Sequence, residues 1–440
     1  MKIFLKLAEF SVRRPWLIIA LTAIFAILFA SRLASMKTDT NPKNMLPANS
    51  GVRVLNDGVE KTFGLYEDML VVGIENDGGV LNAGTLEKIK RVTNEVKLLK
   101  GVAERDVTGL TAIDNVTAEA GALKVSQLVG EVPRDALALE KIKKDVFGNR
   151  LFLNRVISKD GKATAIYVPL EKGSNAKEAA DGVREIIKRE KGPERYYVAG
   201  DPVARDTFGA EMFKLMGVFS PIAGFIMFVV SYLMFKSVLV SVFIMLPAMV
   251  VIAMTMGLIV GLGFPVHIMS SMSPIFLMAI ATDSIHVFNE FYFRYKETRD
   301  KKTAIIETMK VVGAPLIYTD ITTAVGFAGL LLANIIPVKV FGLGVGFGTI
   351  MLLLSSFTLV PALLALLNTG KLDSALNKKD GAGIDRTSAF LGKLGGVGAR
   401  HSKSTVAVGA VLIIIAIFGM TKIVVSNNMV GWFKQSSEVR

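Results

Sequence analysis

The sequence predicts a polytopic α-helical membrane protein of about seven spanning helices, with a large extracytoplasmic α/β domain between the first two. Hydrophobic residues make up 51% of the 440 residues, and the mean hydropathy of +0.48 is high for a soluble protein of this size. The apolar residues gather in blocks long enough to cross a bilayer. One long hydrophilic segment, 36–215, separates the first block from the second.

The apolar blocks set the number of predicted spanning helices. A helix needs about 20 apolar residues to cross the hydrocarbon core. The blocks that meet this requirement cover residues 16–33, 217–235, 238–262, 267–293, 313–333, 340–367 and 405–425. The first follows a short basic segment as a signal peptide would, but it is long and lacks a small-residue cleavage site, so we expect an uncleaved helix.

The basic residues predict the orientation of these helices. Segments 1–15, Lys236, 290–312 and 368–404 carry 18 Lys and Arg against 8 Asp and Glu. All four lie on one side if the helices alternate in direction, and by the positive-inside rule that side is the cytoplasm. We therefore expect a cytoplasmic N-terminus in 1–35 and an extracytoplasmic 36–215. The lack of cysteine suits a bacterial envelope protein, so the expected location is a bacterial inner (cell) membrane. The net charge of +13 thus reports topology, and no nucleic-acid partner is expected.

The hydrophilic segment 36–215 mixes strand and helix patterns. Strands are predicted at 66–74, 162–170 and 196–199, and helices at 84–99, 176–191 and 202–216. Strands that alternate with helices indicate an α/β sandwich of the split βαβ kind. Residues 112–154 form a weaker helical region, a subdomain or a flap. The segment has no nucleophile elbow, phosphate loop or metal-ligand spacing, and the chain has no cysteine, so we expect no enzyme, cofactor or metal.

The remainder of the chain continues in the membrane. A five-helix bundle is predicted over 216–367, with a helix on the cytoplasmic surface at 290–312. A flexible cytoplasmic linker at 368–404 leads to a seventh helix at 405–425. Residues 423–440 echo residues 36–53, with Asn-Met outside a membrane helix and Val-Arg at the end. This echo indicates a duplicated architecture, so that 426–440 would begin a second extracytoplasmic domain and the chain would be a partial transporter.

The candidate site lies in the stretch from Pro274 to Tyr295. Asp283, His286 and Glu290 follow one another at helical spacing on one face. An acid inside a membrane helix is costly and marks a proton or ion pathway by default. We therefore expect Asp283 to carry protons, against the alternative of a structural residue. His286 is either a relay member or an interior hydrogen-bonded histidine. Glu290 is expected at the cytoplasmic mouth as a solvated charge.

Asp320 is a second acid in an apolar block, followed by Thr322 and Thr323. At about 1.5 Å per residue, Asp283 and Asp320 lie roughly 15–16 Å from the nearest cytoplasmic basic markers. They would then face each other across antiparallel helices, although a hydrated structural Asp320 is the alternative. The two threonines either relay protons or bond back to their own helix.

The sixth block carries Gly342, Gly344, Gly346 and Gly348, which form two interleaved Gly-x-x-x-Gly spacings. Such spacings allow helices to approach closely. Helix packing is the expected role, and a sliding or rocking surface is the sharper alternative.

With these residues in view, the chain resembles the resistance-nodulation-division (RND) superfamily, within it the predicted lipid exporters and mycobacterial large membrane proteins (MmpL), which are related to sterol-sensing-domain proteins. Ala279 to His286 is similar to that family's Gly-Ile-Gly-x-Asp-Tyr-x-x-His pattern, and Thr322 to Phe327 to its Thr-Thr-x-x-Gly-Phe. Gly200-Asp201-Pro202 is similar to the close of its external domain. The chain departs from the pattern at Ser284, where many relatives carry Tyr or a second Asp.

The resemblance implies a porter-like external domain, a sterol-sensing-like bundle and export of lipids or other hydrophobic molecules driven by the proton-motive force. No ATP-binding motif is present, which agrees with an ion gradient as energy source. The family's helices eight to twelve have no counterpart here, so an oligomer or a complementary half is expected. The alternatives are a lipid- or sterol-sensing receptor or scaffold without pumping, and an accessory module for protein translocation.

Overall fold

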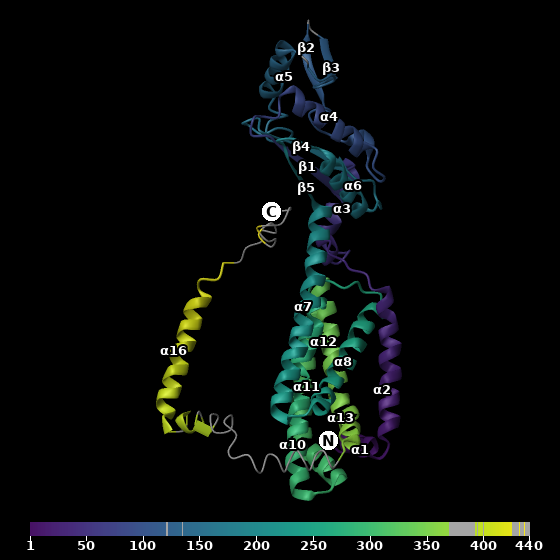
Figure 1. The fold of residues 1–440 in the computed structure, drawn as a ribbon, viewed down its shortest axis with the longest axis vertical. Coiled ribbons are helices and arrows are strands. Elements are labelled where there is room, and N and C mark those ends of the chain that lie inside the picture. The colour runs from purple at the N-terminus through teal and green to yellow at the C-terminus, as the bar shows by residue number, and fades with distance from the viewer. Residues whose placement is uncertain are drawn as a thin grey trace. The chain divides into compact units, whose positions relative to one another are not determined.

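The computed structural model describes residues 1–119, 122–133, 135–368, 392–393, 395–398, 400–424, 431 and 435. The chain divides into two compact units. Met1–Thr38 and Leu215–Asn428 form one, called the membrane unit below, and Asp39–Lys214 with Met429–Arg440 form the other, called the α/β unit. Figure 1 labels the elements of both. The predicted linker at 368–404 and the echo at 423–440 fall largely outside the described residues.

Seven helical segments in the described part of the chain are long and apolar enough to span a membrane, the number that the sequence predicts. They are Pro15–Ser35, Asp201–Phe235, Val238–Gly261, Ser270–Thr298, Lys301–Leu332, Ile336–Leu366 and Ser402–Met420. The second begins in the α/β unit and continues as one helix, α7, into the membrane unit.

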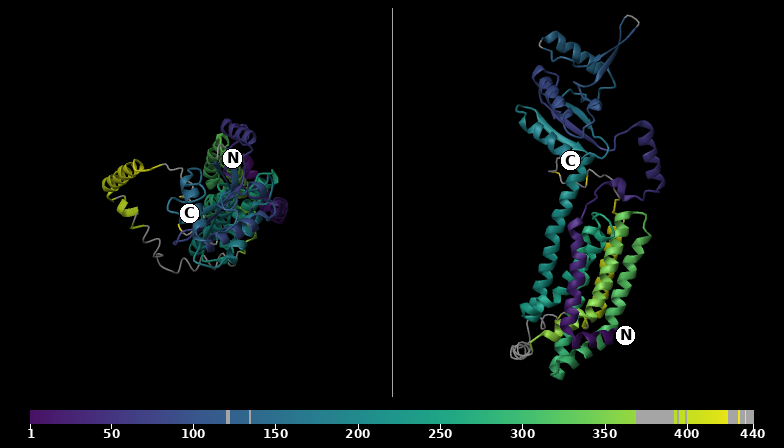
Figure 2. Two further views of the ribbon diagram at one scale, coloured as in Figure 1. Left: turned by 90° about the horizontal axis from the view of Figure 1, so that it is seen from above. Right: turned by 90° about the vertical axis from the view of Figure 1, so that its right-hand side faces the viewer.

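The helices of the membrane unit are, in chain order, α1 (Lys2–Arg13), α2 (Pro15–Ala30), the end of α7 (Asp201–Phe235), α8 (Val238–Gly261), α9 (Ser273–Ile280), α10 (Asp283–Thr298), α11 (Lys301–Ala328), α12 (Ile336–Phe357), α13 (Leu359–Leu366) and α16 (Ser402–Met420). Of these, α2, α8, α11 and α12 are long and run side by side, as Figure 2 shows. Phe288, Phe291 and Phe357 are fully buried in the core of this unit. No residue of α16 is buried.

The basic N-terminal segment forms α1, which buries Ala8 and Val12 against the bundle. One prediction about this unit is wrong. No separate surface helix forms at 290–312, since its charged residues belong to the facing ends of α10 and α11. Arg299 adopts a left-handed conformation, with φ 52°, and ends α10. The Asp300 side chain accepts a 2.9 Å hydrogen bond from the Thr303 backbone N–H and starts α11.

The α/β unit contains a three-stranded sheet in the order β4-β1-β5. Its strands are β1 (Met69–Glu75), β4 (Ala163–Pro169) and β5 (Arg195–Gly200), close to their predicted positions. Because β1 is antiparallel to both neighbours, β4 and β5 run parallel, and α6 (Ala176–Arg189) connects them around β1. This is the split βαβ pattern. The side of the membrane on which the unit lies stays a prediction.

One face of the sheet carries the core of the α/β unit. Alternate residues point to it, as in Leu70, Val72 and Ile74 of β1, which are at most 1% exposed. The apolar sides of α4 (Ala83–Lys97) and α6 cover that face. A side chain from each helix, Ile89 and Val183, is fully buried there. Burial of one face only is what the alternating pattern in these strands predicts.

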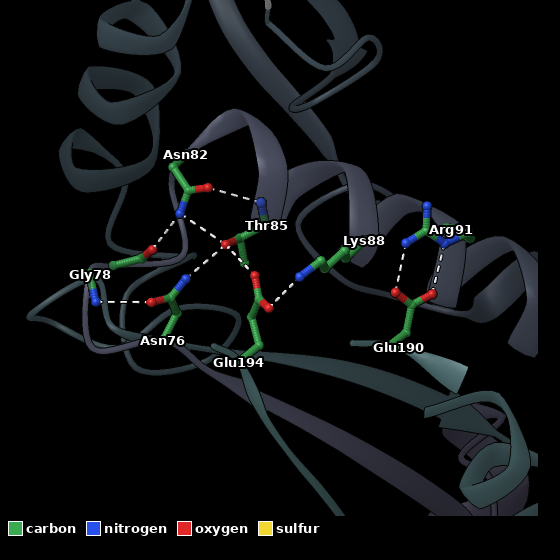
Figure 3. A network of polar contacts seen from close by, with 9 residues as sticks. Asn76, Gly78, Asn82, Thr85, Lys88, Arg91, Glu190 and Glu194 are labelled. Atoms are coloured by element: carbon green, nitrogen blue, oxygen red, sulfur yellow. Dashed lines mark hydrogen bonds and ion pairs between the residues drawn. The ribbon is translucent and has the colours of Figure 1, made fainter. Parts of the chain in front are cut away.

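Polar contacts fix α4 to the segment that leads into β5 (Figure 3). Glu194 accepts hydrogen bonds from Thr85 at 2.8 Å and from Lys88 at 2.5 Å. The Arg91 guanidinium donates to both oxygens of Glu190, at 2.7 and 2.6 Å. That bidentate contact lowers the pKa of the Glu190 carboxyl. Acids in this part of the structure are therefore matched with bases.

The region 112–154 differs from the helical prediction in its first half. Strands β2 (Asp114–Glu119) and β3 (Ala122–Gln127) pair as an antiparallel hairpin, and only then does α5 (Ala136–Gly148) follow. Val116 of one strand pairs with Val125 of the other. Each valine stands between polar neighbours, which is the period-two alternation of a strand. Helix α3 (Gly51–Phe63) is a further element that the sequence reading does not predict.

Candidate functional site

The helix that carries the predicted acid is broken rather than continuous. α9 ends at Ile280, α10 begins at Asp283, and Ala281 and Thr282 form a turn between them. Backbone bonds there tighten to a three-residue spacing, since the N–H groups of Ser284 and Ile285 donate to Ala281 and Thr282 at 3.1 and 2.9 Å. The predicted unbroken stretch from Pro274 to Tyr295 is therefore corrected.

The break places Asp283 at the first residue of α10, half-buried. At this end of a helix the N–H groups lack partners within the helix and the dipole favours negative charge. Broken helices near the centre of a bundle are a feature of transporter binding sites. The position of Asp283 therefore combines an intramembrane carboxyl with the one interruption in its spanning segment.

Asp320 lies on α11, which packs along α10, and is only 1% exposed. Its Oδ1 atom is buried and has no hydrogen-bond partner within the described part of the chain. Asp283 lies close enough for its charge to act on Asp320. The two acids, 37 positions apart in the sequence, thus lie on two helices that pack along each other, and the charge of one acts on the other.

The other predicted relay residues are arranged less favourably. His286 lies one turn after Asp283, and the charges of the two side chains interact, but His286 is exposed. Thr322 is exposed as well, and its hydroxyl donates to the backbone oxygens of Tyr318 and Thr319 at 2.8 and 3.0 Å. Thr323 is half-buried. Of the two roles considered for Thr322, the structure shows the hydrogen bond from its hydroxyl to the backbone of its own helix.

Glu290 lies two turns beyond Asp283 on α10. Its carboxylate accepts a 2.9 Å contact from Arg294, one turn further on. This pair is half-buried, and Arg294 neutralises the charge of Glu290. Glu290 therefore differs from Asp283 and Asp320 in that a base lies beside it.

The glycines of α12 contact both neighbours of the site. A Cβ atom added at Gly342 would lie 2.6 Å from the Phe327 backbone oxygen of α11. One added at Gly348 would lie 2.5 Å from the Leu277 side chain of α9. Gly346 likewise faces α11, and Gly344 faces Ile259 of α8. α12 is therefore packed closely against the helix that carries Asp320 and against the one that ends before Asp283.

A contact that the sequence reading missed joins the start of α11 to the end of α13. The Lys301 ammonium group donates to the backbone oxygens of Ala365 and Leu367 at 2.6 and 3.0 Å. These carbonyls end a helix and have no partner within it. Because the partners are more than 60 residues apart, spacing in the sequence gives no signal of this contact.

The α/β unit contains a separate cavity of about 690 Å³. Apolar side chains such as Met45, Leu46 and Phe208 line it, together with Arg53 and Arg205. Arg205 is paired with Asp68. Arg53 donates to the Leu46 backbone oxygen at 2.9 Å, but its Nε atom is buried without a partner in the described residues. The cavity thus combines an apolar lining with a guanidinium group that has a spare donor.

Fold and site together define a polytopic membrane protein with an α/β unit between its first two spanning helices and paired carboxyl groups inside its bundle. The family model of the MMPL family matches residues 82–382. The chain therefore belongs to the MMPL family, which agrees with the resemblance to the RND superfamily and its MmpL branch.

Two relatives set the match in context. A protein of Methanocaldococcus jannaschii named as a membrane protein, MJ1562, is 24% identical over 386 residues, which cover 83% of this chain and 94% of that protein. The membrane protein YdfJ of Bacillus subtilis is 28% identical over 226 residues, 49% of this chain and 30% of YdfJ. The names describe membrane proteins and specify no substrate.

Proposed function

We propose that this protein exports lipids or other hydrophobic molecules across a cell membrane, driven by the proton-motive force. The proposal depends on one observation above the others. Asp320 is buried inside a spanning helix, lies within reach of the charge of Asp283 on the neighbouring helix, and has an oxygen atom with no hydrogen-bond partner in the described residues. An acid kept from water without a base beside it is costly unless its proton is put to use.

Proton binding would change the repulsion between the two carboxyl groups. Two ionised carboxylates in a medium of low dielectric repel strongly, and one proton removes that repulsion. Asp283 adjoins the break between α9 and α10, so the change in force acts where the backbone is least regular. α12, close-packed on α9 and α11 through Gly348 and Gly342, would transmit the movement to its neighbours.

The cavity in the α/β unit supports a hydrophobic substrate with an anionic group. Its volume of about 690 Å³ lies within the range that holds molecules of drug size. The apolar residues suit a hydrocarbon body, and the spare Arg53 donor suits a phosphate or carboxylate oxygen. We place this unit on the extracytoplasmic side and the N-terminus in the cytoplasm, from the distribution of basic residues.

The test is transport in proteoliposomes with an imposed pH gradient. The readouts are uptake of protons and movement of a fluorescently labelled phospholipid. We expect Asp283→Asn and Asp320→Asn to abolish both while insertion into the membrane stays normal. Glu290→Gln is the matched control, since that acid is paired with Arg294, and should transport normally. Normal transport by both Asn variants would refute the proposal.

A second candidate, a lipid-binding receptor or scaffold that does not pump, is favoured by the separation of the cavity from the acids. All residues that line the cavity belong to the α/β unit. Under this alternative, Arg53→Gln weakens binding of the labelled phospholipid, while neither a pH gradient nor Asp283→Asn has an effect.

A further inference from the structure

Helix α3 exposes an apolar stripe that nothing in the described structure covers. Val52, Leu55, Val59 and Phe63 are 72%, 70%, 40% and 72% exposed, and α3 has no buried residue. Their spacing of three and four places them on one side of the helix. α3 also packs extensively on no other helix or strand of the described chain. Four large exposed apolar side chains in a row are typical of an interaction surface.

The opposite side of α3 is already held. Lys43 contacts Asp57 at 2.8 Å and Glu60 at 2.7 Å. Arg53 donates to the Leu46 backbone oxygen at 2.9 Å. These polar contacts bind α3 to the segment that precedes it and turn the apolar stripe outward.

In the same unit, no layer of the described residues covers one face of the sheet. α4 and α6 cover one face of β4-β1-β5. On the other, Val71 lies between Tyr167 and Ala199, and Gly73 lies between Ala165 and Tyr197. Met69 and Tyr197 on this face are 36% and 43% exposed, and the remaining residues of these two rows are half-buried. The face is therefore apolar around Val71 and Gly73, with small residues at its centre and tyrosines on its outer strands, and it ends at an ion pair between Arg195 and Glu75.

The dimensions of the stripe and the open face agree. The 13 residues of α3 are about 20 Å long, and a helix is about 10 Å across. The strands, of six or seven residues, are also about 20 Å long. Three strands about 4.8 Å apart place the outer two about 10 Å from each other. One helix of this length covers the face.

We propose that α3 of one copy packs its stripe on the open sheet face of a second copy, and that the second copy does the same in return. Both surfaces belong to this chain, agree in size, present large apolar side chains, and are left uncovered by the described residues of one copy. A two-fold dimer satisfies both at once, because each copy supplies one helix and one face. The contact turns each two-layer α/β unit into three layers, with the sheet buried on both sides. This inference is independent of the proposed transport function.

Cysteine cross-linking in the full chain tests the proposal, since the natural sequence has no cysteine. Leu55→Cys and Tyr197→Cys, each with a different affinity tag, are expressed together. Membranes are treated with a short bifunctional thiol reagent, which tolerates a shift in register. We expect a cross-linked dimer that carries both tags. Val54→Cys with Tyr197→Cys is the matched control, since Val54 is 56% exposed but lies off the stripe, and should yield at least tenfold less.

Three results would overturn the proposal. These are the absence of the mixed dimer, a cross-link of Leu55→Cys only to itself, and an internal cross-link in a monomer that carries both cysteines. A second variant guards against misfolding. Val59→Lys with Phe63→Lys, added to the Leu55→Cys chain, places charges on the stripe without changing a buried residue, so it should leave the melting temperature of the chain unchanged and abolish the mixed cross-link.

Discussion

In the α/β unit Glu190 and Glu194 each meet a base, whereas in the membrane unit Asp320 faces another acid. Glu194 has a side chain only 3% exposed and holds Lys88 at 2.5 Å. Asp320 is equally hidden, yet the described residues give its Oδ1 no partner. A buried charge with a partner can stabilise the fold, because the partner offsets the free-energy cost of removing the charge from water. A buried acid without a base destabilises the fold, which is why we propose a role in proton transport for Asp320.

This contrast is tested most strongly by Asp320→Asn. We expect proton uptake in proteoliposomes to fall by about 100-fold or more, because the variant cannot carry the proton. Thermal stability should stay the same or rise, since a buried charge without a base is removed. A clear loss of stability with normal proton uptake would mean that Asp320 is structural.

The opposite pattern is expected for Glu194→Ala. Removing one member of a buried pair leaves Lys88 and Thr85 without their acceptor, at a cost of about 3 kcal/mol. Amide hydrogen exchange of the full chain, read over β1 and β5, should show reduced protection. Transport should follow only the amount of folded protein. Glu185→Gln is the control, because its pair with Lys188 is exposed on both sides and should change nothing.

The next largest effect is expected for stability, when the close packing of α12 beside the two acids is disturbed. At Gly348 an added Cβ would meet Leu277 at 2.5 Å, whereas at Gly326 nothing lies within 4 Å. We expect Gly348→Ala to cost about 1–3 kcal/mol through overpacking. Gly326→Ala should be neutral or slightly stabilising, since alanine favours a helix. Melting temperatures in detergent compare the two. Equal melting temperatures would contradict the close approach of α12 to α9.

The sequence predicts what depends on local pattern. The spans follow from long apolar blocks, and β1, β4 and β5 follow from alternation. The similar depth of Asp283 and Asp320 in the membrane could be predicted, because each acid lies a similar number of residues from basic residues at the same membrane surface. The break at Ala281–Thr282 was not, because neither residue is a strong helix breaker and the break depends on packing. The Lys301 contact was also missed, because its partners are more than 60 residues away in the sequence. α3 was missed although Val52, Leu55 and Val59 follow one another at helical spacing.

The smallest effect concerns the pH dependence of the exposed pair, Arg91 and Glu190. Because Arg91 lowers the pKa of Glu190, the pair contributes fully above the ordinary pKa of a glutamate. The contribution is lost as the pH falls through the lowered value. Arg91 is 49% exposed, so solvent screening limits the contribution to less than about 1 kcal/mol. Glu190→Gln should therefore reduce amide protection around α4 slightly at pH 7, and the difference from the natural chain should shrink toward pH 3. A difference that grows with acidity would show that Glu190 is bound more favourably when protonated, and that its contact with Arg91 does not stabilise the unit.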